Sequence, residues 1–137
     1  MTTVMVFGVF DGVHEGHRAF LEEARHYGDR VIAVVTQDHI VASLKGRAAK
    51  SSVNARADEL RAEDHVDEVV MGDTELGTWD IVVTHKPDVI ALGYDQTELK
   101  KALEAHLENF HWPLEIKVMR PHRPDMYHTS ALNNLVR

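Results

Sequence analysis

Short apolar runs rich in β-branched residues alternate along this chain with stretches of helical periodicity. The run Val31-Ile32-Ala33-Val34-Val35 is apolar at every position, which is typical of a strand covered on both faces. Between Ala19 and Tyr27, apolar residues recur every three to four positions, and the pattern stops at Gly28. The whole pattern predicts strands at 3–7, 30–36, 68–71, 89–92 and 114–119, and helices at 18–27, 53–62, 77–85 and 98–110.

Strands separated by helices of this length predict an α/β fold, a three-layer Rossmann-like domain. We expect a five-stranded parallel sheet with helices on both faces and right-handed crossovers. No internal repeat or linker interrupts the pattern, so residues 1–137 are expected to form a single domain. In such sheets ligands bind beyond the carboxyl ends of the strands, and the segments that follow strands are therefore the candidate site.

Composition excludes several classes of protein. The formal net charge of −7 argues against general binding to nucleic acid or to an anionic membrane. The chain has no cysteine, which excludes disulfides and thiolate metal sites. It shows neither a basic leader pattern nor an apolar stretch long enough to span a bilayer, so a cytoplasmic location is expected.

The densest basic cluster lies in an irregular stretch, residues 42–52, which follows the second predicted strand. It contains Lys45, Arg47 and Lys50. Such runs are usually solvated surface loops. However, this one lies at the same sheet edge as the end of the first strand, and that position favours contact with a phosphate group.

Residues 8–17, GVFDGVHEGH, connect the first strand to the first helix and carry the most informative pattern in the chain. A helix amino terminus with nearby glycines suits a phosphate, because backbone N–H groups and the helix dipole favour an anion. His14 and His17 are three residues apart and therefore project from one face of the first turn. The dipole favours neutral rings, which can donate to phosphate oxygens. Two alternatives are a metal pair, for which no third ligand stands out, and a simple tight turn.

The same ten residues resemble the G-x-F-D-x-x-H-x-G-H signature of the cytidylyltransferase-like nucleotidyltransferases, relatives of the HIGH-motif enzymes. This resemblance implies nucleotidyl transfer without an enzyme nucleophile, with His14 and His17 as catalytic residues. Asp11 has two candidate roles, as a water-mediated metal ligand or as a structural residue of the turn. The signature also implies nucleotide contacts from Gly8, Val9, Phe10, Asp11, His14, Glu15, Gly16 and His17.

Two later segments are similar, more narrowly, to the archaeal-type FAD synthetases. The first is LGYDQ at 92–96, directly after the fourth strand, although Asp95 would also serve as an ordinary helix N-cap. The second is YHTS at 127–130, before a short predicted helix at 131–136, where relatives have a turn that holds the triphosphate. Arg123 is our candidate for the phosphate-binding arginine that relatives have nearby. The implied nucleotide contacts are Gly93, Tyr94, Asp95, Arg123, Tyr127, Thr129 and Ser130.

Two partial matches complete the resemblance. Lys45-Gly46-Arg47 resembles the K-G-R segment of the FAD synthetases, which implies a catalytic Lys45 that contacts the substrate or a phosphate. Arg56 falls where relatives have an E-x-R helix start, and we expect it to bind nucleotide phosphate. The glutamate of that pattern is absent here.

The resemblance implies an adenylyltransferase that moves AMP from ATP onto the phosphate of FMN, giving FAD and pyrophosphate. Mg²⁺, or another divalent cation, should arrive with ATP and without a dedicated protein metal site. A flat slot for the flavin ring would draw on Tyr94, Trp112, Met126 or Tyr127. The alternatives are a cytidylyltransferase for glycerol 3-phosphate, an enzyme for another polyol or sugar phosphate, and a non-catalytic nucleotide sensor. ATP and FMN are the expected partners, and a homodimer is possible by analogy.

Overall fold

The computed structural model describes residues 1–120, and the predictions made for residues 121–137, including the helix at 131–136, lie outside the described residues. All five predicted strands are present and pair in parallel, in the order β3-β2-β1-β4-β5. The sheet confirms the predicted five-stranded α/β architecture. Its strands are β1 (Thr3–Gly8), β2 (Arg30–Val35), β3 (Glu68–Met71), β4 (Val89–Leu92) and β5 (Glu115–Val118).

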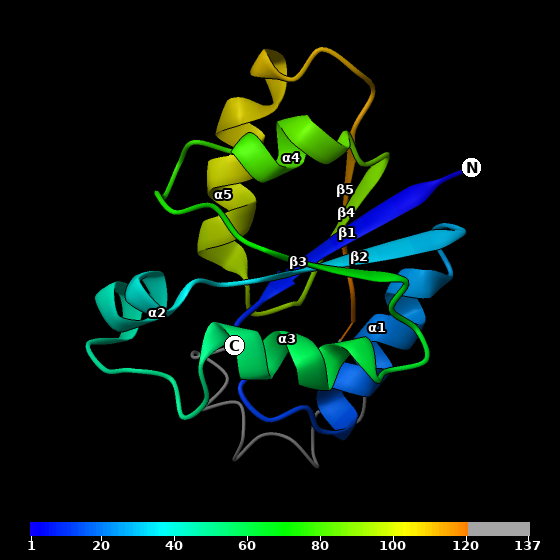
Figure 1. Ribbon diagram of the computed structural model, residues 1–137. Helices are drawn as coiled ribbons and strands as arrows, with labels where there is room; N and C mark the ends of the chain where they lie inside the picture. Colours follow the sequence, from blue (N-terminus) through cyan, green and yellow to red (C-terminus); the bar gives the residue numbers. More distant parts are fainter. Residues whose placement is uncertain (121–137) are drawn as a thin grey trace.

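Helices cover both faces of this sheet, as the pattern predicts (Figure 1). α1 and α3 pack on one face, α4 and α5 pack on the other, and α2 lies beyond one end of the strands (Figure 1). The helices are α1 (Glu15–Arg25), α2 (Asp38–Lys45), α3 (Val53–Arg61), α4 (Asp80–His85) and α5 (Thr97–His106), and a 3₁₀ turn (Leu107–Asn109) follows α5. Within residues 1–120 no helix is both long and apolar enough to cross a membrane.

Alternate side chains of the central strands enter two separate cores. Val4 and Val6 of β1 are fully buried in the core under α1 and α3. Met5, between them, is fully buried in the core under α4 and α5. This alternation is the period of a strand, and it explains why β1 and β2 are apolar at nearly every position.

The position of β1 defines where a ligand site belongs. The chain runs outward from β1 through β2 to β3, and then crosses back to β4 on the opposite side of β1. The order of strands therefore reverses at β1, and the carboxyl ends of β1 and β4 border the crevice in which parallel sheets bind ligands.

Four elements differ from the sequence expectation by more than one residue. α1 spans Glu15–Arg25 and not 18–27, and α5 ends at His106 and not at residue 110, where a 3₁₀ turn follows it. α2 occupies part of the stretch predicted as irregular, and it ends at Gly46, whose left-handed φ of 71° is typical of a residue that ends a helix. α4 begins at Asp80 and not at residue 77, because Gly77 (φ 84°) and Trp79 (φ 57°) have left-handed backbones that a helix cannot include.

Candidate active site

The turn between β1 and α1 has a strained backbone. Phe10 has a φ of 53° although it is a bulky residue, and Gly12 has a φ of 85°. Left-handed conformations of aromatic residues are rare and cost about 1–3 kcal/mol, so neighbouring groups must hold them. One such neighbour is Gly8, where an added Cβ would lie 2.9 Å from Cε2 of the Phe10 ring. The missing side chain of Gly8 therefore makes room for the Phe10 ring.

The two signature histidines cap α1. The backbone N–H of Gly16 donates to Nδ1 of His14 at 3.0 Å, and the backbone N–H of His14 donates to Nδ1 of His17 at 3.3 Å. These bonds satisfy N–H groups that would otherwise lack a partner at a helix start. Because each Nδ1 accepts a hydrogen bond, the pattern assigns the proton of each neutral ring to Nε2. The rings stack with their centroids 3.9 Å apart.

Phe10 supports this pair of histidines. Its side chain is 3% exposed, and its ring packs against the ring of His17 at a centroid distance of 5.5 Å. His17 is itself buried, with 6% of its surface exposed. The strained turn thus fixes the orientation of His17 through direct ring packing. The sequence showed that Phe10 belongs to the signature but not that its side chain has this task.

Asp11 anchors the turn to the segment between α2 and α3. Its carboxylate accepts from the backbone N–H of Lys50 at 2.6 Å and from that of Ser51 at 3.1 Å. Of the two roles expected for Asp11, the structure supports the structural one. Within residues 1–120 no group of three His, Cys, Asp or Glu side chains is arranged to hold a metal ion.

Arg56 provides a second anchor, from inside the protein. Its side chain is fully buried. Nη1 donates to the Val9 carbonyl at 2.8 Å, Nε to the Ser51 carbonyl at 3.0 Å, and Nη2 to Oδ1 of Asp38 at 2.7 Å. This guanidinium lowers the pKa of the Asp38 carboxyl, and a backbone hydrogen bond from Val53 acts in the same direction. Arg56 therefore binds protein groups in this structure, where we had expected it to contact phosphate directly. The sequence gives its charge but not its burial.

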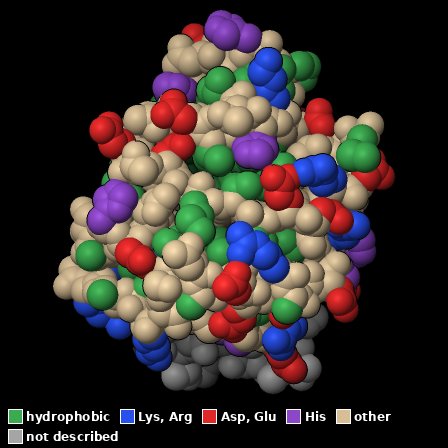
Figure 2. Space-filling view, in the orientation of Figure 1, with side chains coloured by type: hydrophobic (Ala, Val, Ile, Leu, Met, Phe, Trp, Pro, Cys, Tyr) green, Lys and Arg blue, Asp and Glu red, His purple; other side chains and the backbone are tan. Residues whose placement is uncertain are grey.

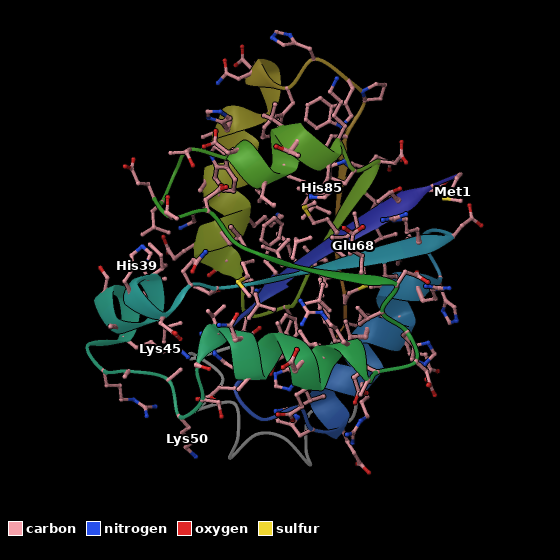
Figure 3. All side chains as sticks on the ribbon, in the orientation of Figure 1. Met1, His39, Lys45, Lys50, Glu68 and His85 are labelled. Carbon is pink, nitrogen blue, oxygen red and sulfur yellow. The ribbon has the colours of Figure 1, made fainter. Side chains whose placement is uncertain are left out.

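Lys45 is the last residue of α2 and lies close to these anchors. Figure 3 shows it between α2 and the start of α3, with Lys50 farther out on the joining segment. Burial, and to a smaller extent the nearby charge of Arg47, lower the pKa of the Lys45 ammonium to about 8, whereas the charge of Asp11 opposes the change. A lysine with this pKa still carries its charge at neutral pH and can be placed against a phosphate at a modest desolvation cost.

The loop from β4 to α5 is fixed by Gln96. Its side-chain Oε1 accepts from the Gly93 N–H at 2.7 Å, and its Nε2 donates to the Phe7 carbonyl at 2.9 Å. These bonds join the carboxyl ends of β4 and β1. Gln96, and not Asp95, is the N-cap residue of α5, so the capping role considered for Asp95 is wrong. Tyr94 is half-buried in the same loop.

A cavity of about 460 Å³ opens at this edge of the sheet. Gly8 and Val9 of the signature turn line it, and so do Lys45 and Asp95. The structure thus brings four residues predicted from separate segments to one cavity. His14 and His17 lie on the α1 side of the same turn, and Arg56 lies beneath it. Arg123, Tyr127, Thr129 and Ser130 fall outside the described residues.

The aromatic wall of this cavity was missed from sequence. Trp79 lines the cavity, together with Phe7 at the end of β1. Trp112, which we considered for a flat slot, donates from Nε1 to the Pro87 carbonyl at 2.8 Å. Pro87 precedes β4, so Trp112 lies at the amino ends of the strands, at the edge away from the signature turn. Its proposed role in that slot is wrong.

A second, wider hollow of about 970 Å³ lies along α1, beside the residues that follow α3. Glu22, Glu23, Glu63 and Asp64 are among its lining residues. This hollow shares only Glu15 with the signature, whereas Gly8 and Val9 of the signature turn line the smaller cavity. The smaller cavity at the carboxyl ends of the strands is therefore the better candidate.

Comparison with known proteins agrees with this geometry. The family described as cytidylyltransferase-like matches residues 5–132. The FAD synthase of Thermococcus sibiricus is 37% identical over 130 residues, which cover 94% of this chain and 88% of that protein. The FAD synthase of Pyrococcus horikoshii is 42% identical over 106 residues, covering 74% of this chain and 72% of that protein.

Solved structures show the same architecture. The lipopolysaccharide core biosynthesis protein from Thermoplasma volcanium superposes with a TM-score of 0.81 at 30% identity, covering 89% of this chain and 98% of that one. Pantothenate synthetase from Thermus thermophilus shares the fold at a TM-score of 0.61 and 15% identity, covering 91% of this chain and 58% of that one. With the signature turn, the strand order and these matches together, the chain belongs to the cytidylyltransferase-like family.

Proposed function

We propose that this protein is an FMN adenylyltransferase, which joins the AMP moiety of ATP to the phosphate of FMN to form FAD and pyrophosphate. The observation that carries the proposal is the cavity that starts at the signature turn, with Lys45 at its border and apolar side chains along its walls. The similarity to archaeal FAD synthases supports the same reaction.

In this mechanism an oxygen of the FMN phosphate attacks the α-phosphorus of ATP. A new P–O bond forms there, the bond from the α-phosphorus to the bridging oxygen breaks, and that oxygen leaves with pyrophosphate. The attacking oxygen is already anionic, so the enzyme needs to supply position and charge stabilisation and no nucleophile. Nε2–H of His14 and of His17 would donate to the triphosphate, where negative charge develops.

The remaining residues are assigned by position and by family resemblance. Lys45 would offset charge as pyrophosphate departs, and Gly93, Tyr94 and Asp95 would contact the nucleoside. Arg123, Tyr127, Thr129 and Ser130 remain proposed contacts of the triphosphate. Mg²⁺ would be held by the phosphates and by water, which suits a site without a carboxylate cluster among residues 1–120, and it would neutralise phosphate charge when bound.

The apolar lining also favours FMN over the runner-up acceptor. Glycerol 3-phosphate and similar polyol phosphates would require polar side chains around their hydroxyl groups, because unpaired hydroxyls are costly to bury. Ile40, Leu44, Leu76 and Trp79 are among the residues that line the cavity, and they offer no such partners apart from the indole N–H. A flavin ring suits this surface better.

One assay separates the three candidate functions. The protein is incubated with Mg²⁺, FMN and either ATP or CTP, while pyrophosphate release and flavin fluorescence are followed. Fluorescence should fall with ATP, as FMN becomes FAD. Turnover only with CTP and glycerol 3-phosphate would support a cytidylyltransferase, and nucleotide binding without any turnover would support a sensor. Light scattering of the same sample would show whether the protein forms the homodimer considered by analogy.

A further inference from the structure

Two leucines that line the cavity are largely exposed to solvent and are not part of either hydrophobic core. Leu44, on α2, is 62% exposed, and Leu76, in the loop after β3, is 63% exposed. Both line the same cavity, and Figure 2 shows hydrophobic side chains on this face around α2 and between α2 and the middle of the molecule. Exposed leucines from two separate segments that line one cavity indicate a surface that an apolar ligand covers.

The walls that carry these leucines are held in place. Nε2 of Gln37 donates to the Gly72 carbonyl at 3.0 Å, and Nε2 of His39 is 2.7 Å from the Thr74 carbonyl. These bonds join the first turn of α2 to the loop at 72–79. The cavity is therefore bounded by fixed elements and is formed before a ligand arrives.

Trp79 forms the inner part of the apolar wall. The N–H of Ile81 donates to Oδ1 of Asp73 at 2.9 Å, which closes the loop immediately around Trp79. The left-handed backbone of Trp79 costs free energy, and such strain is tolerated where the surrounding structure fixes a side chain for a purpose. Its indole lines the cavity and also packs near His106 of α5 at a centroid distance of 5.9 Å.

The lining of the cavity combines a cation, several carboxylates and a set of apolar side chains. Lys45, Gly8 and Val9 lie where the cavity meets the signature turn, so an anionic group belongs there. Leu44, Leu76 and Trp79 form the apolar part. A molecule with a phosphate at one end and a flat apolar ring at the other matches both parts.

We propose that Leu44, Leu76 and Trp79 bind the ring of the acceptor and determine which phosphate compound this enzyme accepts. This inference rests on the proposed function, and it assigns the ring to side chains that the sequence pattern did not indicate. A flat ring gains by stacking on an indole and by covering leucine side chains.

The test places a carboxylate at the mouth of the cavity. Leu44→Glu and Leu76→Glu each change an exposed residue, so the fold should tolerate them, and thermal unfolding checks this. Val83→Glu is the matched control, because Val83 is 47% exposed on α4 and does not line the cavity. The KM for FMN should rise about tenfold or more in both leucine variants, since a charge must then be desolvated against the ring. The KM for ATP should stay unchanged, and Val83→Glu should behave as the unmodified protein.

Riboflavin, which has the ring but lacks the phosphate, provides a readout that does not depend on turnover. Its binding, measured from flavin fluorescence, should weaken in the two leucine variants and not in Val83→Glu. If FAD forms normally and both leucine variants keep the original KM for FMN, the ring binds elsewhere and the inference is wrong. If the unmodified protein forms no FAD, the proposed function is wrong. The riboflavin measurement then tests the ring site by itself: weaker binding in the two leucine variants supports it, and unchanged binding contradicts it.

Discussion

The lowered pKa of Lys45 predicts an alkaline loss of activity that an ordinary lysine would not cause. Burial and the neighbouring Arg47 lower this pKa to about 8 from the ordinary value of 10.5. The proposed role of Lys45 requires its positive charge. Activity should therefore be present below pH 8 and should be lost as the pH rises through that value, because deprotonation removes the charge.

The size of the effect follows from the titration. With a pKa of about 8, roughly nine-tenths of the Lys45 side chains are charged at pH 7 and roughly one-tenth at pH 9. We expect kcat/KM to fall about tenfold for each pH unit above 8, because only the charged form stabilises the departing pyrophosphate. The fall should level off after a total loss of about 10²–10³, the usual cost of removing one charge-stabilising group.

The assay is a pH–rate profile between pH 6.5 and 10, recorded at saturating Mg²⁺. The phosphates of both substrates lose their last proton near pH 6, so they do not titrate in the alkaline limb. The alkaline limb in kcat/KM reports the pKa of Lys45 in the free enzyme. The limb in kcat should lie at higher pH, because bound phosphates favour the charged lysine.

Lys45→Arg is the matched control, because a guanidinium stays charged throughout this range. Its activity at pH 7 will be lower if the geometry of the ammonium matters, but its alkaline limb should disappear. An unchanged limb in Lys45→Arg would show that another group titrates there. A flat profile in the unmodified enzyme, combined with a large loss in Lys45→Ala, would refute the lowered pKa of Lys45.

Four further predictions concern the turn and its anchors. His17→Ala should lower kcat by about 10²–10³, with nucleotide binding measured separately by calorimetry and little changed. Arg56→Met should destabilise the protein by about 3–5 kcal/mol in urea unfolding, because buried carbonyl groups lose their donor, and Arg56→Lys should recover part of this. Gly8→Ala should lower kcat while changing the free energy of unfolding only slightly, because the new Cβ displaces the Phe10 ring that orients His17. Unchanged kinetics would contradict this packing role of Phe10. Folding lowers the pKa of Asp38, so the ionised carboxylate contributes stability above about pH 4, and this contribution is lost as the pH falls through the lowered pKa. Asp38→Asn should therefore reduce the loss of stability at low pH, measured by unfolding between pH 3 and 7.

The location of the site could be predicted from sequence because it depends on local patterns. Glycines and histidines between an apolar strand and an amphipathic helix mark a strand-to-helix turn, and β1 and α1 occur there. Lys45 and Asp95 could be placed at the same edge for a similar reason, since each follows a strand in a parallel sheet.

Burial and long-range bonds could not be predicted in this way. The sequence shows Arg56 as a charge near a helix start, and only the packing of α3 reveals that its guanidinium is enclosed by Val9, Ser51 and Asp38. Trp79 falls inside the helix predicted at 77–85 but lies in the loop before α4, and no sequence pattern connects it to β1. α2 was missed because no side chain caps its start, although Gly46 directly after Lys45 does signal its end.

The central place of β1 has a consequence for how the enzyme forms. β1 precedes β4 in the chain and pairs with it, and Val4 is matched with Val89, which lies far away in sequence. A nascent chain that has only reached β3 therefore holds the histidine turn on a strand with one hydrogen-bonding edge still open, which invites pairing with other chains. The cavity beside the signature turn can form only after β4 and the loop that carries Gln96 have been synthesised. Contacts this distant in sequence slow folding, so the turn after β1 reaches its working form only after β4, which is synthesised later.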